Sequence, residues 1–108
     1  MTFLRQKICE YNDLTALSAK EFTLEKDAFL IYFRQQCYAY ENSCPHMRAN
    51  LNWQEGQFFT LDGLFLQCSL HGALFEPSSG LCVRGPCVGE SLKKINLVIK
   101  DGAVYTDE

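Results

Sequence analysis

Cys44-Pro45-His46 and Cys68-Ser69-Leu70-His71-Gly72 are the two segments from which the fold of this chain can be predicted. Each offers one thiolate and one imidazole, and the chain has no histidine outside them. Few metal sites take two sulfur and two nitrogen ligands delivered in this order. A binuclear iron–sulfur cluster in which two histidines replace two cysteines on one iron does so. The two cysteines and two histidines are therefore predicted to bind a 2Fe–2S cluster.

This ligand set also indicates the chemistry of the site. A 2Fe–2S core held by four thiolates is a dianion, whereas two thiolates and two neutral imidazoles leave it without net charge. The uncharged core accepts an electron more readily, so its potential is about −150 to +300 mV, against about −400 mV for plant-type clusters. Each imidazole keeps a second N–H that can lose a proton, which couples reduction to pH. The site is suited to one-electron transfer.

Zinc is the competing metal. Two cysteines and two histidines can complete a tetrahedral structural zinc site. Zinc-binding domains, however, usually place two cysteines on one arm and two histidines on the other. In this chain each arm mixes the two ligand types, which favours the binuclear cluster. A zinc-stabilised Cys2His2 binding domain is kept as the alternative from a different functional class.

The pattern C-x-H followed by C-x2-H, with Pro45 inside the first segment and Gly72 after the second, resembles that of the Rieske 2Fe–2S family. The resemblance implies that the cofactor and metal ligands are Cys44, His46, Cys68 and His71. It also implies an all-β fold of stacked antiparallel sheets, with a cluster-binding subdomain inserted in a base domain. In that family a loop with glycine and proline covers the cluster, and Gly85-Pro86 is similar to it.

Short strand signals and turn residues follow one another along most of the chain. Phe29–Phe33 and Cys37–Tyr40 are rich in aromatic and β-branched residues and predict a hairpin. Asp62-Gly63 and Asp101-Gly102 each separate two further strand candidates. Asp-Gly favours a type I′ turn, because both central residues of that turn need a positive φ. Pro77–Gly80 is predicted to be another turn.

The strands are predicted to form one nested domain over residues 1–108. A base of antiparallel strands uses residues 1–43 and 89–108, and the segment 44–88 sits on it as the cluster-binding subdomain. Helix signals are poor. Tyr11–Lys20 is expected to be either a short helical turn or a loop that leads into a strand.

The chain departs from the high-potential members of the Rieske family at four positions. Those proteins join the two ligand loops by a disulfide, and the corresponding residues in this chain are Ala49 and Leu70. They also donate a Ser and a Tyr hydroxyl to the cluster, where this chain has Ala73 and Phe75. Fewer donors stabilise the reduced cluster less, so we expect a potential at the low end of the range.

This pattern is similar to that of soluble Rieske-type ferredoxins. The resemblance implies a one-electron carrier that passes electrons from a flavin-dependent reductase to a terminal oxygenase or similar redox enzyme. The alternative is the small Rieske subunit of an assimilatory nitrite reductase. Both histidines are assigned to the cluster, so the chain is expected to be an electron-transfer component without a catalytic site of its own. Met47 and Leu70 adjoin the ligand histidines and are predicted either to line a docking surface or to pack within their loops.

The composition also indicates which classes of partner the protein can bind. The chain has 108 residues and a formal net charge of −3, which argues against binding to nucleic acid. A mildly acidic surface can steer the protein toward a basic patch on a redox partner. The longest apolar run, Ala28–Phe33, is far too short to span a membrane. Residues 1–10 lack the apolar stretch of a secretory signal, so we expect a cytoplasmic protein without membrane contact.

Four cysteines are left after the predicted ligands are assigned: Cys9, Cys37, Cys82 and Cys87. Cys82 and Cys87 flank a short loop and could form a disulfide. In a cytoplasmic protein, reduced cysteines that act as small buried hydrophobic residues are the expected state.

Overall fold

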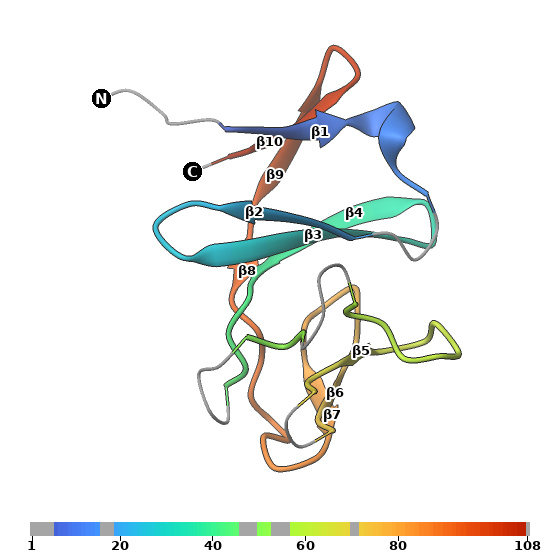
Figure 1. Cartoon of the computed structure of the whole chain (residues 1–108), viewed down its shortest axis with the longest axis vertical. Helices are drawn as coiled ribbons and strands as arrows, with labels where there is room; N and C mark the ends of the chain where they lie inside the picture. The colour runs from blue at the N-terminus through green and yellow to red at the C-terminus, as the bar shows by residue number, and fades with distance from the viewer. Residues whose placement is uncertain (1–5, 16–18, 46–49, 53–56, 70–71, 108) are drawn as a thin grey trace.

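The computed structural model describes residues 6–15, 19–45, 50–52, 57–69 and 72–107, and Figure 1 shows their arrangement. The described residues form three antiparallel sheets and one short 3-10 turn, η1 (Tyr11–Asp13). No helix among them is long and apolar enough to cross a membrane. The prediction of an all-β fold built from stacked antiparallel sheets is confirmed.

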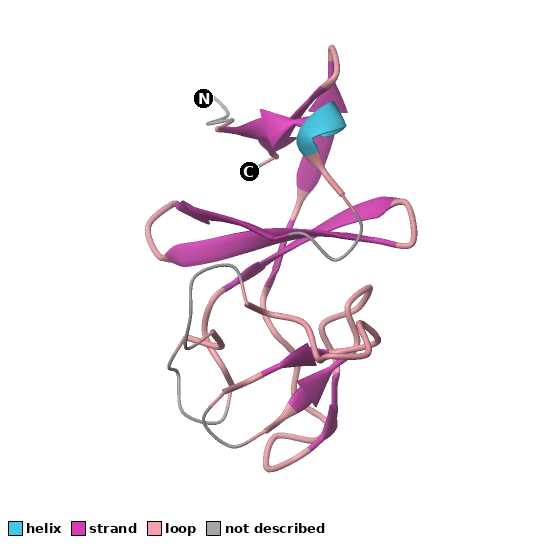
Figure 2. Cartoon of the chain, turned by 45° about the vertical axis from the view of Figure 1, so that its right-hand side comes forward, coloured by secondary structure: helices cyan, strands magenta, loops and turns pink. Residues whose placement is uncertain are grey.

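Each sheet is built from short strands, and strands that are neighbours in a sheet are hydrogen-bonded to each other. From edge to edge, the first sheet contains β1 (Lys7–Glu10), β10 (Ala103–Thr106) and β9 (Leu97–Lys100). The second sheet contains β2 (Ala19–Thr23), β3 (Asp27–Phe33), β4 (Gln36–Glu41) and β8 (Lys94–Ile95). The third sheet contains β5 (Leu66–Gln67), β6 (Leu74–Phe75) and β7 (Cys82–Arg84). In Figures 1 and 2 the second sheet lies between the other two.

Strand β3 supplies apolar side chains to both faces of the central sheet. Because successive side chains of a strand point to opposite faces, Phe29 and Ile31 lie on one face and Ala28 and Leu30 on the other. All four are buried. Two hydrophobic cores result, one on each side of the sheet.

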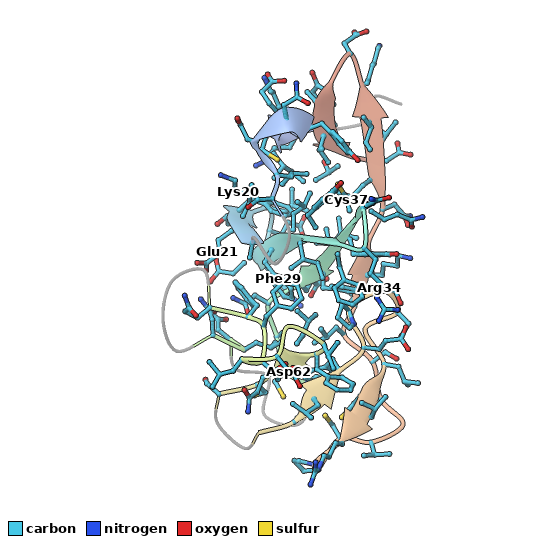
Figure 3. The ribbon with its side chains drawn as sticks, turned by 90° about the vertical axis from the view of Figure 1, so that its right-hand side faces the viewer. Lys20, Glu21, Phe29, Arg34, Cys37 and Asp62 are labelled. Atoms are coloured by element: carbon cyan, nitrogen blue, oxygen red, sulfur yellow. The ribbon has the colours of Figure 1, made fainter. Side chains whose placement is uncertain are left out.

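The lower core lies between the central sheet and the third sheet. Phe29 stacks on Phe58 with ring centroids 4.1 Å apart, and Figure 3 shows Phe29 below the central strands. The buried residues of this lower core are Phe29, Ile31, Phe33, Tyr40, Cys44, Leu51, Phe58, Leu66, Cys68, Ala73, Phe75, Cys82, Cys87 and Leu92.

The upper core lies between the central sheet and the first sheet. It is smaller than the lower core and is closed by Val104 of β10. Its buried residues are Leu14, Ala28, Leu30, Ala39, Ile95 and Val104. The chain thus places its first sheet over one face of β2–β3–β4 and the segment between β4 and β8 over the other.

Two of the predicted hairpins are confirmed. Strands β3 and β4 pair along their full length, and the two residues that join them, Arg34 and Gln35, have φ of 50° and 67°. Strands β9 and β10 pair in the same way around Asp101-Gly102, where φ is 52° and 76°. Both connections have the two positive φ angles of a type I′ turn. The Tyr11–Lys20 segment was expected to form a short helical turn or a loop that leads into a strand. It contains the helical turn η1 and ends in strand β2.

The turn at Asp62-Gly63 differs from the predicted type I′ turn. Gly63 has a φ of 73°, whereas Asp62 is not among the described residues with positive φ. The Asp62 carboxylate instead accepts hydrogen bonds from the Thr60 hydroxyl (2.5 Å) and the Leu64 N–H (3.0 Å). The expected strand before the turn is reduced to a single bridge between Phe59 and Leu66. Side-chain hydrogen bonds of Asp62 therefore shape the turn itself. Its two arms stay paired through backbone bonds from the Thr60 N–H to the Phe65 carbonyl and from the Gln67 N–H to the Phe58 carbonyl.

Tyr40 of β4 connects the central sheet to the turn after β6. Its hydroxyl donates a hydrogen bond of 2.6 Å to the carbonyl of Pro77. The predicted turn at Pro77–Gly80 is confirmed: the Gly80 N–H bonds the Glu76 carbonyl at 2.7 Å, and Gly80 has a φ of 77°. A Cβ on Gly80 would lie 2.8 Å from the Tyr40 ring. Gly80 therefore allows both the turn and the close approach of the Tyr40 ring.

We expect Gly80→Ala to destabilise the protein more than Gly102→Ala does. Both glycines have nearly the same φ, 77° and 76°, so each alanine carries the left-handed penalty of about 1–2 kcal/mol. The Gly102 Cβ meets nothing within 4 Å, whereas the Gly80 Cβ meets the buried Tyr40 ring. That overpacking adds about 1–3 kcal/mol for Gly80→Ala alone. Urea unfolding of both variants measures the difference, and equal losses would contradict this role of Tyr40.

Candidate metal centre

Cys44 and Cys68 lie at the beginnings of two loops that both follow strands. Cys44 comes three residues after the end of β4, and Cys68 directly follows β5. Their relative exposures are 1% and 0%, and both belong to the lower core. All six cysteines lie in the described part of the chain, and none forms a disulfide. The structure therefore brings the predicted sulfur ligands into one buried region. His46 and His71 lie outside the described residues.

Asn42 holds the first loop in place from the end of β4. It is 3% exposed, and its Oδ1 accepts a hydrogen bond of 2.7 Å from the Leu51 N–H. Its Nδ2 donates to Asn52 Oδ1 at 2.8 Å. Its backbone N–H bonds the Asp27 carbonyl at 2.8 Å. One buried amide thus fixes both ends of the loop that carries Cys44.

The second loop is closed by its own backbone. The Cys68 N–H bonds the Ala73 carbonyl at 2.9 Å, and the Gly72 N–H bonds the Cys68 carbonyl at 3.0 Å. Gly72 has a φ of 67°, which glycine adopts without strain.

A direct hydrogen bond joins the two loops. The Ser69 N–H donates to the Leu51 carbonyl at 2.8 Å. Leu51 is the same residue whose N–H binds Asn42, so the bonds form a path from β4 through the first loop to the second. Ala49 and Leu70, where high-potential relatives carry the disulfide, are outside the described residues. The described loops are connected by backbone hydrogen bonding.

The segment predicted to cover the cluster, Gly80–Pro86, contains β7 and packs against the second loop. Gly85 has a φ of 101°, and a Cβ on it would lie 2.9 Å from the Ala73 Cα. Glycine is required at this position because two backbones meet. Ala73 and Phe75 are fully buried in the lower core with Cys44 and Cys68. The segment Gly80–Pro86 therefore lies beside the loop that carries Cys68.

The surroundings of the two thiols fit an uncharged metal cluster. Among the described residues, the buried polar or charged residues are Asn42 and Thr106, and neither carries a charge. An apolar interior without a compensating cation strongly disfavours a net charge. Two thiolates and two neutral imidazoles give the 2Fe–2S core no net charge, so this ligand set suits the site better than four thiolates.

Within the described ranges, no three His, Cys, Asp or Glu side chains are grouped so that they could hold a metal. Cys82 and Cys87 share the lower core with Cys44 and Cys68 but do not form such a group with them. Met47, which was predicted either to line a docking surface or to pack within its loop, also lies outside the described residues.

Sequence reasoning missed Asn42 and the bond between Leu51 and Ser69. Asn42 directly follows a strand, where a polar residue is ordinary. Its burial follows from contacts with residues 50–52, which no local pattern reveals.

Comparisons with known proteins agree with this fold and site. The family model of the Rieske 2Fe-2S domain matches residues 5–100. Ferredoxin CarAc from Metapseudomonas resinovorans is 32% identical over 101 residues, which are 92% of this chain and 89% of that protein. The chain belongs to the Rieske 2Fe–2S family.

Solved structures of similar fold include ferredoxins of dioxygenase systems. A chain in a complex of reduced oxygenase and oxidised ferredoxin in carbazole 1,9a-dioxygenase has a TM-score of 0.79 and 26% identity, with 95% of this chain and 92% of that chain covered. The ferredoxin of carbazole 1,9a-dioxygenase from Nocardioides aromaticivorans IC177 has a TM-score of 0.77 and 19% identity, with coverages of 95% and 96%. This chain carries a Rieske-type 2Fe–2S cluster and is a one-electron carrier.

Asn42→Ala is expected to destabilise the protein by about 1–3 kcal/mol, because it leaves the buried Leu51 N–H without an acceptor. It should also speed the loss of iron to a chelator, because the first loop loses its attachment to β4. Asn50→Ala is the matched control: the exposed Asn50 makes one hydrogen bond of 3.4 Å to Asp27, so a change within about 0.5 kcal/mol is expected. Equal iron-loss rates in the two variants would contradict the positioning role of Asn42.

Proposed function

We propose that Cys44, His46, Cys68 and His71 are the four ligands of the cluster, with the cysteines on one iron and the histidines on the other. The burial of Cys44 and Cys68 in one core, on loops joined by the Leu51–Ser69 hydrogen bond, is the observation that supports this assignment. When bound, the cluster supplies a centre that gains and loses one electron. The chain's own contribution is to hold the thiolates and exclude water from them.

We infer that the chain receives electrons from a flavin-dependent reductase and passes them to a terminal oxygenase. Two observations on relatives support this inference: CarAc is a ferredoxin, and a similar ferredoxin fold occurs in a complex with an oxygenase. The net charge of −3 suits transient docking on a basic patch. A nitrite reductase large subunit is the second candidate acceptor.

The protein is proposed to be an electron-transfer component without a catalytic site of its own, because its two histidines are both assigned to the cluster. A cytoplasmic location is proposed with it. Six cysteines without a disulfide support a reducing compartment.

We further propose that residues 1–43 and 89–108 form a base and residues 44–88 a cluster-binding subdomain. All strands of the third sheet lie between β4 and β8, which supports this division. Residues 90–92 are hydrogen-bonded to the subdomain: the Cys82 N–H bonds the Glu90 carbonyl at 2.8 Å, and the Leu92 N–H bonds the Gly80 carbonyl at 2.9 Å. Residues 90–92 thus form the connection through which the chain returns from the subdomain to the base.

Iron and sulfide analysis of the anaerobically purified protein tests the proposed cluster. We expect a red-brown protein with two iron and two acid-labile sulfide per chain, as a binuclear cluster requires. Cys44→Ala should lose both and should expose the amides of residues 57–69 to hydrogen exchange, because metal binding contributes to the folding of a site that is not preformed. The amides of β3 and β4 should stay protected.

Cys37→Ser is the matched control for Cys44→Ala, since Cys37 is a half-buried cysteine of the base. It should keep the full iron content. A colourless wild-type protein with one tightly bound zinc would contradict the cluster. Unchanged exchange across 57–69 in Cys44→Ala would contradict the subdomain division.

Ala73→Ser and Phe75→Tyr are each expected to raise the reduction potential. These positions correspond to the hydroxyl donors of high-potential relatives, and a donor to the reduced cluster stabilises its extra negative charge. A hydrogen bond to a charged group is worth about 1.5–3 kcal/mol at most. For a one-electron couple this corresponds to tens of millivolts, up to about 100 mV, since about 59 mV is a tenfold change in the equilibrium constant. Protein-film voltammetry measures the shift.

The controls for these variants are Ala28→Ser and Phe22→Tyr. They add the same hydroxyls in or beside the upper core, on the opposite side of the central sheet. Their potentials should equal that of the wild type. If Ala73→Ser and Phe75→Tyr also leave the potential unchanged with the cluster intact, the two side chains do not face the cluster.

A further inference from the structure

Cys82 of β7 and Cys87, which follows Pro86, form a pair of thiols that the proposed ligand set does not use. Their Sγ atoms are 2.8 Å apart, and each residue is 1% exposed. The four residues between them, Val83 to Pro86, are exposed. The pair is thus buried beneath a short surface loop.

The backbone around the pair is already arranged for a closed loop. The Cys82 N–H bonds the Glu90 carbonyl at 2.8 Å, and the Glu90 N–H bonds the Cys87 carbonyl at 2.9 Å. The Cys87 thiol donates to Cys82 Sγ, and the Cys82 thiol donates to the Arg84 carbonyl at 3.3 Å. A disulfide needs a sulfur–sulfur distance of about 2.05 Å, so closing the pair requires only small side-chain rotations.

We propose that Cys82 and Cys87 are a reversible redox site, which forms a disulfide within the loop that packs against the second ligand loop. The two thiols lose two protons and two electrons, and a sulfur–sulfur bond forms between them. The oxidant is a small-molecule disulfide, which accepts both electrons and both protons and leaves as two thiols. Exchange begins when the exposed loop opens and one cysteine attacks this oxidant.

The pair also shares a hydrophobic core with the proposed ligand Cys44. Cys87 and Cys44 are both in the lower core. The pKa of the Cys87 thiol is raised by burial first and then by its hydrogen bond to Cys82. Cys87 has a single thiol hydrogen, and the disulfide removes it.

Thiol counting on the cluster-containing protein tests the site. The protein is equilibrated anaerobically with mixtures of oxidised and reduced glutathione, quenched in acid and alkylated after denaturation. The reduced protein should label six thiols, its full cysteine content, and the oxidised protein four. Trypsin cuts after Arg84, between the two cysteines, so the two flanking peptides stay joined only through a disulfide.

The joined peptides should disappear in Cys82→Ser and Cys87→Ser. Cys37→Ser is the control and should still lose two thiols on oxidation. No loss of thiols at any glutathione ratio, or a linkage that involves Cys9 or Cys37, would overturn the proposed redox site.

A colourless protein that still joins Cys82 to Cys87 would contradict the proposed cluster while leaving the redox site in place.

Discussion

The burial of β3 on both faces is the constraint on which the rest of the structure depends. Four consecutive residues, Ala28 to Ile31, are almost completely buried, and their side chains alternate between the upper and lower cores. A strand covered on both faces requires a layer on each side. The first sheet provides one layer. The segment between β4 and β8 provides the other, so the ligand loops are part of the layer that the lower face of β3 needs.

The loops that carry Cys44 and Cys68 are held by a few directed hydrogen bonds to this central layer. Asn42 extends from the end of β4 to Leu51, and the Leu51 carbonyl continues to Ser69. Tyr40 and Gly80 make a second connection on the same side of the sheet. These attachments are non-covalent. Metal binding is therefore expected to contribute directly to the order of the loops.

The apolar lower core that stabilises the fold also sets the environment of the electron-transfer site. The described residues of the lower core offer no buried charge to balance a charged cluster, so the mixed sulfur and nitrogen ligand set matches it. Ala73 and Phe75, at the positions where we expect hydroxyl groups to stabilise the reduced state, belong to the same apolar core. Cys82 and Cys87 add polarisable thiols to the same core.

The sequence by itself determined the all-β class and the two hairpins at β3–β4 and β9–β10, and it predicted the ligand types. These features rest on local chemistry, because a ligand spacing, an aromatic run or an Asp-Gly pair acts within a few residues. Tertiary structure alone decided the burial of Asn42 and the meeting of Gly85 with Ala73. Sequence analysis also did not predict the short strands β1, β2, β6 and β7. Strands of two to five residues are too short to show a clear alternation of apolar and polar side chains. Their stability comes from pairing with segments that are distant in the sequence.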